Sequence, residues 1–259
     1  MSTDATTGLA AERHQRIRDL LRGQRVARVD ELSEVLKVSP ATIRRDLEEL
    51  ERHGVLQRVH GGAVASEGTP EEPLFDDKTS IAASEKEAIA EAALPFLGPR
   101  DTIYLDGGST VLALARRLQC FPQLTVVTNS LRVAHAFSGT GPRVILAGGE
   151  LRRLSQTFVG PLSRHVLAST NFAVAFVGTV GLSFADGLTT TDPAEAFTKE
   201  LAIAHAQRVV LLSDSAKFGK TSLARFATAS DLDVLITDRR APAAELAQFR
   251  NADVQVIAV

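Results

Sequence analysis

The stretch that decides the fold of the N-terminal part of the chain is Ser39-Pro40-Ala41-Thr42-Ile43-Arg44-Arg45-Asp46-Leu47. Serine is a frequent helix N-cap and proline suits the first helical position, so the stretch predicts a helix that begins at its proline. Ile43, Leu47 and Leu50 recur at helical spacing and mark the inward face. Gly54 supplies a stop signal, and we therefore predict a helix from the proline to about residue 53.

Outward from this stretch, residues 12–65 have the pattern of a winged helix-turn-helix. An apolar group followed by Gly23 predicts a first helix, and Asp30 is placed to cap a short second helix directly before the decisive stretch. Residues 25–29 and 55–59 alternate between polar and apolar side chains, as short strands do. Two helices, a tight turn, a third helix and a hairpin are the parts of a DNA-binding unit.

The third helix of such a unit enters the major groove with its N-terminal residues on base edges. Arginine suits this position because its planar fork pairs with two acceptors on guanine, or with phosphate. The hairpin that follows would be a wing that touches the DNA backbone or minor groove. The predicted DNA-contacting residues are Ser39, Thr42, Arg44, Arg45, Arg58 and His60.

The same helix has an alternative interpretation. Arg44 and Glu48, like Arg45 and Glu49, are four residues apart, the spacing of ion pairs on an ordinary solvated helix. The pattern by itself leaves both interpretations open.

Bulk composition narrows the class of protein only slightly. The 259 residues are 44% hydrophobic, enough for a sizeable core, and include one cysteine, too few for a disulfide framework. The net charge of −2 gives no hint of a nucleic-acid partner. We expect residues 1–11 to be disordered and to hold no secretory signal. The apolar runs are too short to span a bilayer, so we expect a cytoplasmic protein with no membrane partner.

The remainder of the chain has the pattern of an α/β domain. Residues 66–80 are rich in Glu, Pro, Gly and Thr and predict a linker. Over residues 81–259, short β-branched runs alternate with helical patterns, which predicts a mostly parallel sheet covered by helices on both faces. The expected strands are Thr102–Leu105, Leu124–Thr128, Arg143–Leu146, Phe172–Val177, Val209–Ser213, Val234–Thr237 and Val254–Ile257.

Polar, glycine-rich segments follow several of these strands. Ligands of open α/β sheets bind beyond the carboxyl ends of the strands, and a helix N-terminus there favours an anion. The segments therefore predict a site for a small polyhydroxylated ligand with a phosphate. The candidate residues are Asp106, Gly107, Gly108, Ser109, Thr110, Thr128, Asn129, Ser130, Gly148, Gly149, Gly178, Gly181, Glu195 and Lys217.

Each of these segments also has a purely structural alternative. The glycines can serve tight turns only, residues 128–130 can simply cap a helix, and Lys217 can be a solvated surface lysine.

The decisive stretch continues through Leu50, Gly54 and Arg58 to His60-Gly61-Gly62-Ala63. In this form it resembles the DeoR family of bacterial transcriptional regulators, and the resemblance extends over the rest of the chain. The resemblance implies that residues 12–65 bind double-stranded operator DNA, and it favours this over the solvated-helix interpretation.

The resemblance also implies that the C-terminal domain is similar to the sugar-phosphate isomerase and CoA-transferase-like fold and senses a phosphorylated sugar. The segment 106–110 would then hold the phosphate, and the segments 128–130, 148–149 and 178–181, with Lys217, would surround the sugar. The implied protein is a homodimer or homotetramer that represses a carbohydrate-metabolism operon and responds to this ligand.

Two motifs depart from the family pattern. The sequence around Lys217 has Ala216 where the family has a serine, which puts a hydroxyl role at that position in doubt. Asp106-Gly107-Gly108-Ser109-Thr110 varies the family's D-x-G-T-T but keeps the aspartate and the order glycine, hydroxyl, hydroxyl.

Two other functions compete with a ligand-responsive repressor. An isomerase or deaminase with a DNA-binding head needs paired acid–base groups, but the turn over residues 177–183 has no titratable side chain. Asp106, Asp192 and Glu195 remain as candidate acids, so catalysis is disfavoured. A constitutive DNA-binding oligomer would not need so many Gly, Ser and Thr residues after its strands. The histidines show no metal-ligand spacing, and we expect neither a metal nor a cofactor.

Overall fold

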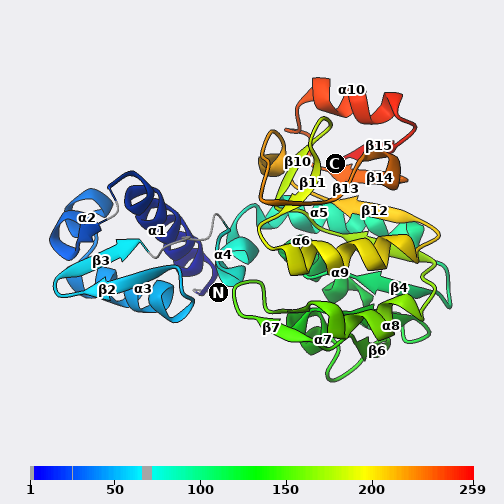
Figure 1. Cartoon of the computed structure of the whole chain (residues 1–259), viewed down its shortest axis with the longest axis horizontal. Helices are drawn as coiled ribbons and strands as arrows, with labels where there is room; N and C mark the ends of the chain where they lie inside the picture. Colours follow the sequence, from blue (N-terminus) through cyan, green and yellow to red (C-terminus); the bar gives the residue numbers. More distant parts are fainter. Residues whose placement is uncertain (1–2, 25, 66–71) are drawn as a thin grey trace. The chain divides into compact units, whose positions relative to one another are not determined.

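The computed structural model describes residues 3–24, 26–65 and 72–259. The chain divides into two compact units, residues 1–81 and residues 82–259 (Figure 1). In the described ranges, no helix is long and apolar enough to cross a membrane.

The first unit is a winged helix-turn-helix. Helix α3 begins at Pro40, and the Ser39 hydroxyl accepts a hydrogen bond from the Thr42 N–H at 3.2 Å, as a helix N-cap does. The wing is the antiparallel sheet β1-β3-β2. The elements of this unit are α1 (Thr3–Gln24), β1 (Val26–Arg28), α2 (Val29–Leu36), α3 (Pro40–Arg52), β2 (Leu56–Val59), β3 (Gly62–Ala65) and α4 (Phe75–Ser80).

Two helix starts differ from the sequence prediction. Helix α1 begins at Thr3, so the disorder predicted for residues 1–11 does not hold for residues 3–11. Its buried stripe includes His14 and Arg18, and these polar side chains hide the helical periodicity from a search for apolar residues. Helix α2 begins one residue before Asp30, which lies in its first turn and is not the N-cap.

The linker predicted over residues 66–80 is partly helical. Residues 66–71 lie outside the described residues, but α4 follows them, with Leu74 and Phe75 buried. Helix α4 packs against α1, so the first unit extends to Ile81.

The second unit is an α/β domain built on a seven-stranded parallel sheet with the order β15-β14-β12-β9-β4-β5-β6 (Figure 1). The chain enters at β4, extends to β5 and β6 on one side, and then adds β9, β12, β14 and β15 on the other. All pairings within this sheet are parallel, so the carboxyl ends of its strands lie at one edge. The strands are β4 (Thr102–Leu105), β5 (Thr125–Thr128), β6 (Arg143–Leu146), β9 (Val174–Val177), β12 (Val209–Leu212), β14 (Val234–Thr237) and β15 (Gln255–Ala258).

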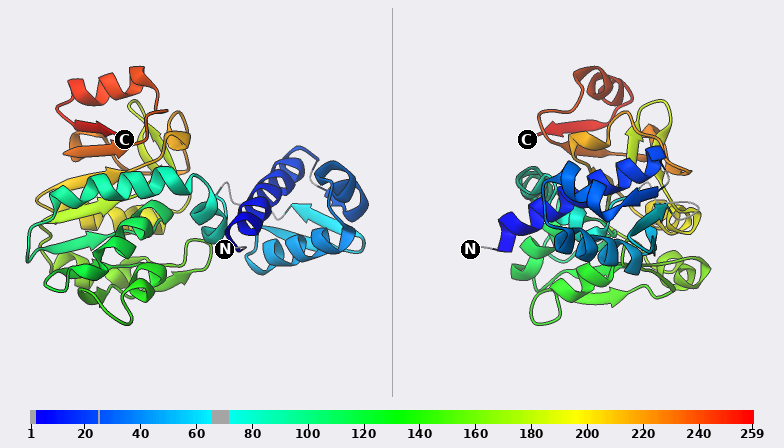
Figure 2. Two further views of the ribbon diagram at one scale, coloured as in Figure 1. Left: turned by 180° about the vertical axis from the view of Figure 1, so that it is seen from behind. Right: turned by 90° about the vertical axis from the view of Figure 1, so that its left-hand side faces the viewer.

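Helices cover both faces of this sheet. Helix α9 lies in front of the sheet in Figure 1, and α5 lies in front of it in the rear view of Figure 2. The helices are α5 (Ala83–Ala93), α6 (Ser109–Arg117), α7 (Leu131–Ala136), α8 (Arg164–Ala168), α9 (Pro193–Ala204) and α10 (Ala243–Asn251), with short 3-10 turns η1 (Leu94–Phe96), η2 (Leu118–Cys120), η3 (Pro161–Ser163), η4 (Ser215–Lys217) and η5 (Ala229–Asp231).

Two small antiparallel sheets in this unit have no counterpart in the sequence prediction. Most of their strands contain Gly, Glu or Arg, so they lack the continuous apolar run that marks the strands of the main sheet. They are the hairpin β7 (Glu150–Arg152) and β8 (Thr157–Val159), and the sheet of β10 (Gly181–Ser183), β11 (Gly187–Thr190) and β13 (Ala224–Ala227).

Candidate functional site

The start of α3 and the hairpin β2–β3 present polar side chains to solvent. Arg44 and Arg45 are exposed on α3, and the hydroxyls of Ser39 and Thr42 lie 2.9 Å apart at its N-terminus. We call the six predicted DNA-contacting residues the recognition surface: Ser39, Thr42, Arg44, Arg45, Arg58 and His60.

The solvated-helix interpretation predicts ion pairs of Arg44 with Glu48 and of Arg45 with Glu49, and neither pair is formed in the described structure. Glu49 instead accepts a hydrogen bond from Arg52 at 2.5 Å and lies 3.4 Å from His53. Within the described part of the chain, neither Arg44 nor Arg45 has an ion-pair partner. Both guanidinium groups can therefore pair with guanine or phosphate without first breaking a salt bridge.

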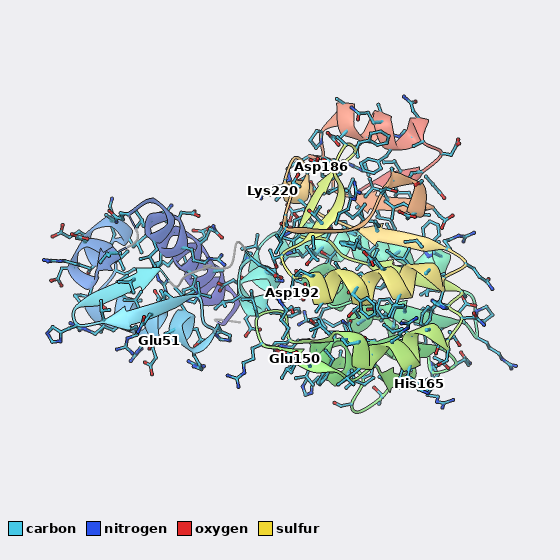
Figure 3. The ribbon with its side chains drawn as sticks, viewed as in Figure 1. Glu51, Glu150, His165, Asp186, Asp192 and Lys220 are labelled. Carbon is cyan, nitrogen blue, oxygen red and sulfur yellow. The ribbon has the colours of Figure 1, made fainter. Side chains whose placement is uncertain are left out.

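The wing is tied to the end of α3. The Arg58 N–H donates to the carboxylate of Glu51 at 2.8 Å, and its guanidinium lies 3.9 Å from the same carboxylate. Glu51 is labelled in Figure 3. Gly61, with φ of 79°, makes the hairpin turn beside the exposed His60.

The sheet of the second unit changes winding direction between β4 and β9. Asp106 follows β4 and Gly178 follows β9, and the Gly178 N–H donates to the Asp106 carboxylate at 3.0 Å. Ligands of open α/β sheets bind at such a topological switch point. The structure thus brings two of the predicted ligand residues together where a ligand is expected.

Lys199 of α9 completes this contact. Its ammonium group donates to the carboxylate of Asp106 and, at 3.1 Å, to the carbonyl of Gly178. It also lies 5.2 Å from the ring centre of Phe226. Lys199 and Asp106 are 5% and 1% exposed. Since an isolated buried charge is costly, each stabilises the other.

Glu195, one helical turn before Lys199, is the centre of a second polar group. Its carboxylate accepts hydrogen bonds from the hydroxyls of Thr190 at 2.8 Å and Thr157 at 3.1 Å, and from Arg152 at 3.2 Å. This buried carboxylate is therefore held in one orientation from three directions.

Arg152 joins the hairpin β7–β8 to the start of α9. Besides Glu195, it donates to Asp192 at 3.2 Å and to Thr191 at 3.0 Å. Figure 3 labels Asp192 at the start of α9 and Glu150 at the start of β7. We call these two polar groups together, with the Gly178 backbone, the switch-point cluster: Asp106, Arg152, Thr157, Gly178, Thr190, Glu195 and Lys199.

The predicted residue Asn129 is oriented by its neighbours. The Tyr104 hydroxyl donates to Asn129 Oδ1 at 3.0 Å, and Asn129 Nδ2 donates to the Phe158 carbonyl at 3.0 Å. Burial raises the pKa of the Tyr104 phenol well above its ordinary value, and the nearby Asp106 and Glu195 carboxylates raise it further. The phenol is therefore a neutral hydrogen-bond donor.

The neighbours of Asn129 have structural roles. The Ser130 hydroxyl accepts from the Val133 N–H at 3.3 Å and caps α7, while Thr128 Oγ1 accepts from the Ser130 N–H at 3.0 Å. Ser130 therefore caps α7.

The predicted glycines serve two different purposes. A Cβ at Gly107 would lie 2.0 Å from Cγ2 of Thr157, so this glycine allows β8 to pack closely. A Cβ at Gly149 or at Gly181 would also clash, because it would lie 2.6 Å or 2.4 Å, respectively, from a backbone carbonyl oxygen. A Cβ at Gly108 or at Gly148 would meet nothing within 4 Å, so these two glycines border open space that a ligand could fill.

Gly108 is also the N-cap of α6. No side chain caps this helix in the described structure, and Ser109 and Thr110 lie in its first turn. Gly148 is exposed after β6, and Lys217 is half-buried in η4 after β12, at the same edge of the sheet. No group of three or more His, Cys, Asp or Glu side chains in the described ranges is arranged to hold a metal ion.

Sequence reasoning missed several members of the switch-point cluster. Lys199 has one local signal, its position four residues after Glu195 on the same helix face. Arg152 and Thr157 come from a hairpin that was not predicted, and Thr190 from an unpredicted strand.

A winged helix-turn-helix joined to an α/β domain with a polar switch point defines a DNA-binding regulator with a sensor domain. The matching family descriptions are "DeoR-like helix-turn-helix domain" for residues 13–69 and "DeoR C terminal sensor domain" for residues 81–239. The chain belongs to the DeoR family of transcriptional regulators.

Named relatives are similar over nearly the whole chain. The HTH-type transcriptional regulator GlpR of Haloferax volcanii is 37% identical over 96% of this chain and 98% of its own length. The putative aga operon transcriptional repressor of Escherichia coli O157:H7 is 32% identical, over 96% and 94%. The lactose phosphotransferase system repressor of Staphylococcus epidermidis is 35% identical, over 88% and 91%.

Among solved structures, the ribose 5-phosphate isomerase A of Methanocaldococcus jannaschii is 15% identical. The aligned region covers 51% of this chain and 53% of the isomerase chain, with a TM-score of 0.39.

Proposed function

We propose that this regulator represses a carbohydrate-metabolism operon and that a phosphorylated sugar modulates its binding to operator DNA. The observation that carries the proposal is the switch-point cluster, which lies beside the uncapped N-terminus of α6. Two relatives, the putative aga operon transcriptional repressor and the lactose phosphotransferase system repressor, are named as repressors of sugar genes, which supports repression here.

Operator DNA is bound by the recognition surface. Arg44 and Arg45 contact base edges or phosphates, Ser39 and Thr42 contact phosphates at the start of α3, and the wing touches the backbone or minor groove through Arg58 and His60. The protein acts as a homodimer or homotetramer, and its winged helix-turn-helix units, which we call heads, bind paired half-sites in pairs.

The sugar phosphate is bound at the carboxyl edge of the sheet. Its phosphate lies on the amides of residues 107–110, where the helix dipole of α6 favours an anion, and Lys217 supplies a positive charge. The sugar hydroxyls bond to polar groups around it. These groups come from Asp106, Thr128, Asn129, Ser130, Gly148, Gly149, Gly178, Gly181 and Glu195.

The ligand changes operator affinity only if it binds the two states of the protein differently. A tenfold loss of operator affinity needs about 1.4 kcal/mol of coupling between the two sites. We propose that the ligand favours an arrangement of heads that fits the operator poorly, so that repression is relieved.

Thermal unfolding of the full chain against a panel of sugar phosphates and their parent sugars tests the sensor. A ligand at about 100 times its Kd adds about 2.7 kcal/mol, which shifts the unfolding temperature of the sensor by about 5–11 °C. We expect such a shift with one phosphate and none with its parent sugar. No shift across the panel would contradict the proposal, and turnover at ordinary enzyme rates would favour an isomerase instead.

Gly108→Ala offers a matched variant for this experiment. Its methyl group enters open space in the folded chain, and alanine is a poorer N-cap than glycine but restricts the unfolded chain, so stability should change by less than about 1 kcal/mol. The methyl group should obstruct the phosphate and abolish the ligand-induced shift. Gly139→Ala, which also enters open space but lies after α7, should keep the shift.

A further inference from the structure

Three buried charged side chains join α1, α3 and α4 within the first unit. His14 of α1 has its Nε2 3.3 Å from Asp46 of α3 and its Nδ1 3.0 Å from Asp77 of α4. All three residues are 5–6% exposed. Neither the recognition surface nor the switch-point cluster includes them.

Asp46 connects this cluster to DNA recognition. It directly follows Arg44 and Arg45 in α3, and it faces inward while they face solvent. Arg13 of α1 donates to both oxygens of Asp46, from Nε at 2.7 Å and from Nη2 at 2.9 Å. This two-bond pair holds the helix that carries the two arginines against α1.

Asp77 connects the cluster to the end of the first unit. Helix α4 is the last element before residue 82, where the second unit, which we call the sensor unit, begins. Other contacts also hold this segment, because Glu72 accepts a hydrogen bond from Lys78 at 2.5 Å, and its carbonyl accepts one from Arg18 at 2.9 Å. Loss of the contact between His14 and Asp77 would therefore not release α4.

The charges of the cluster cancel only while His14 is protonated. Burial lowers the pKa of His14, but the hydrogen bonds and charges of Asp46 and Asp77 outweigh burial and raise it to about 9. The imidazolium and Arg13 then balance the two carboxylates. Deprotonation would leave two carboxylates on opposite sides of a neutral ring, with one negative charge uncompensated.

We propose that His14 is a positioning residue that transmits displacements of α4 to α3, through Asp77 on one side and Asp46 on the other. Helix α4 is the part of the first unit that the chain joins directly to the sensor unit. The bond to Asp77 makes α1 follow α4, and the bonds to Asp46 make α3 follow α1. The arginines of the recognition surface move with α3.

Operator affinity of the full chain between about pH 7 and pH 10 tests this role, with far-UV circular dichroism at each pH to measure the folded fraction. We expect the wild-type affinity to fall as pH rises through about 9 while the protein stays folded. Asp77→Asn should keep the affinity at pH 7 within about threefold and move the fall to lower pH. Glu12→Gln makes the same charge change at an exposed position of α1, so its operator affinity should depend on pH as that of the wild type does.

A second variant covers the case in which Asp77→Asn does not fold. His14→Gln keeps an amide in place of the ring but cannot titrate, so its profile should lack the fall near pH 9. A wild-type profile in Asp77→Asn or in His14→Gln would overturn the proposal. An equal loss of affinity at every pH would also overturn it, because that result indicates a role in folding only.

Transmission from the sensor rests on the proposed function and needs a separate measurement. The ligand for this measurement is a sugar phosphate that stabilises the full chain in the panel. With it, Asp77→Asn should keep the thermal shift, but the ligand-induced change in operator affinity should be at least about threefold smaller than in the wild type. An undiminished response would overturn transmission through His14. If no sugar phosphate binds, the proposed function fails, while the pH profile still decides the role of His14.

Discussion

The recognition surface and the switch-point cluster use similar side chains in opposite ways. Arg44 and Arg45 are exposed and, in the described structure, without ion-pair partners, whereas Lys199 and Arg152 are inward-facing and bonded to carboxylates. Cations at the surface cost little to leave unpaired because water solvates them. Buried charges must be paired within the fold.

The difference predicts which substitutions affect stability and which affect binding. Removing an exposed arginine leaves no group uncompensated, so it should change DNA affinity and spare the fold. Removing one member of a buried pair strands its partner, so it should first change the stability of the sensor unit.

Lys199→Ala should have the largest effect. It leaves the Asp106 carboxylate buried without its cation, which we expect to destabilise the second unit by about 3–5 kcal/mol in urea unfolding. Lys220→Ala, at an exposed lysine labelled in Figure 3, should change stability by less than about 0.5 kcal/mol. Equal effects of the two variants would contradict the comparison.

His14 extends the comparison, because it is a buried charge inside the DNA-binding unit. Its pKa is raised from 6.5 to about 9, so its stabilising contribution is complete below pH 6.5 and is lost as pH rises through 9. The free energy of unfolding of the first unit should fall by about 3 kcal/mol between these limits, measured by urea titration at several pH values. The fall should be absent in His14→Gln; its persistence there would assign it to other groups.

Arg45→Ala should act on binding alone. We expect a loss of about 1–3 kcal/mol of operator affinity, about 5- to 150-fold, and relaxed preference at one base pair, measured by fluorescence anisotropy with operator variants. Its thermal stability should match that of the wild type. Arg52→Ala removes an arginine that is bonded to Glu49 near the end of α3, and it should leave the base preference intact. An unchanged affinity and preference in Arg45→Ala would remove this residue from the recognition surface.

Ser39→Ala should destabilise the protein less than either loss of a buried charge. It removes the N-cap of α3 and should cost about 1 kcal/mol in thermal unfolding, while Ser39→Gly should cost only a few tenths. If both variants unfold like the wild type, the cap does not stabilise α3.

The parts of the fold that local signals specify could be predicted from the sequence. The N-cap Ser39, the proline after it and the inward stripe fix α3, and short β-branched runs mark the seven strands of the main sheet. Asp106 and Glu195 could be predicted because they lie next to strand ends and helix starts. These features depend on residues close together in the chain.

The parts that depend on distant partners could not be predicted. The pairs Lys199–Asp106 and His14–Asp77 join residues 93 and 63 positions apart. Helix α4 has too few residues to show a periodicity, and its burial against α1 stabilises it. Tertiary contact therefore decides the features that sequence patterns leave open.

Operator affinity of the full chain, with and without a panel of sugar phosphates, tests the central claim most directly. The operator can be selected from a pool of randomised duplexes, and each phosphate is compared with its parent sugar. We predict that one phosphate lowers the affinity about tenfold or more, that its parent sugar does not, and that Gly108→Ala abolishes the effect. An operator affinity that no sugar phosphate changes would contradict the account of a ligand-responsive repressor.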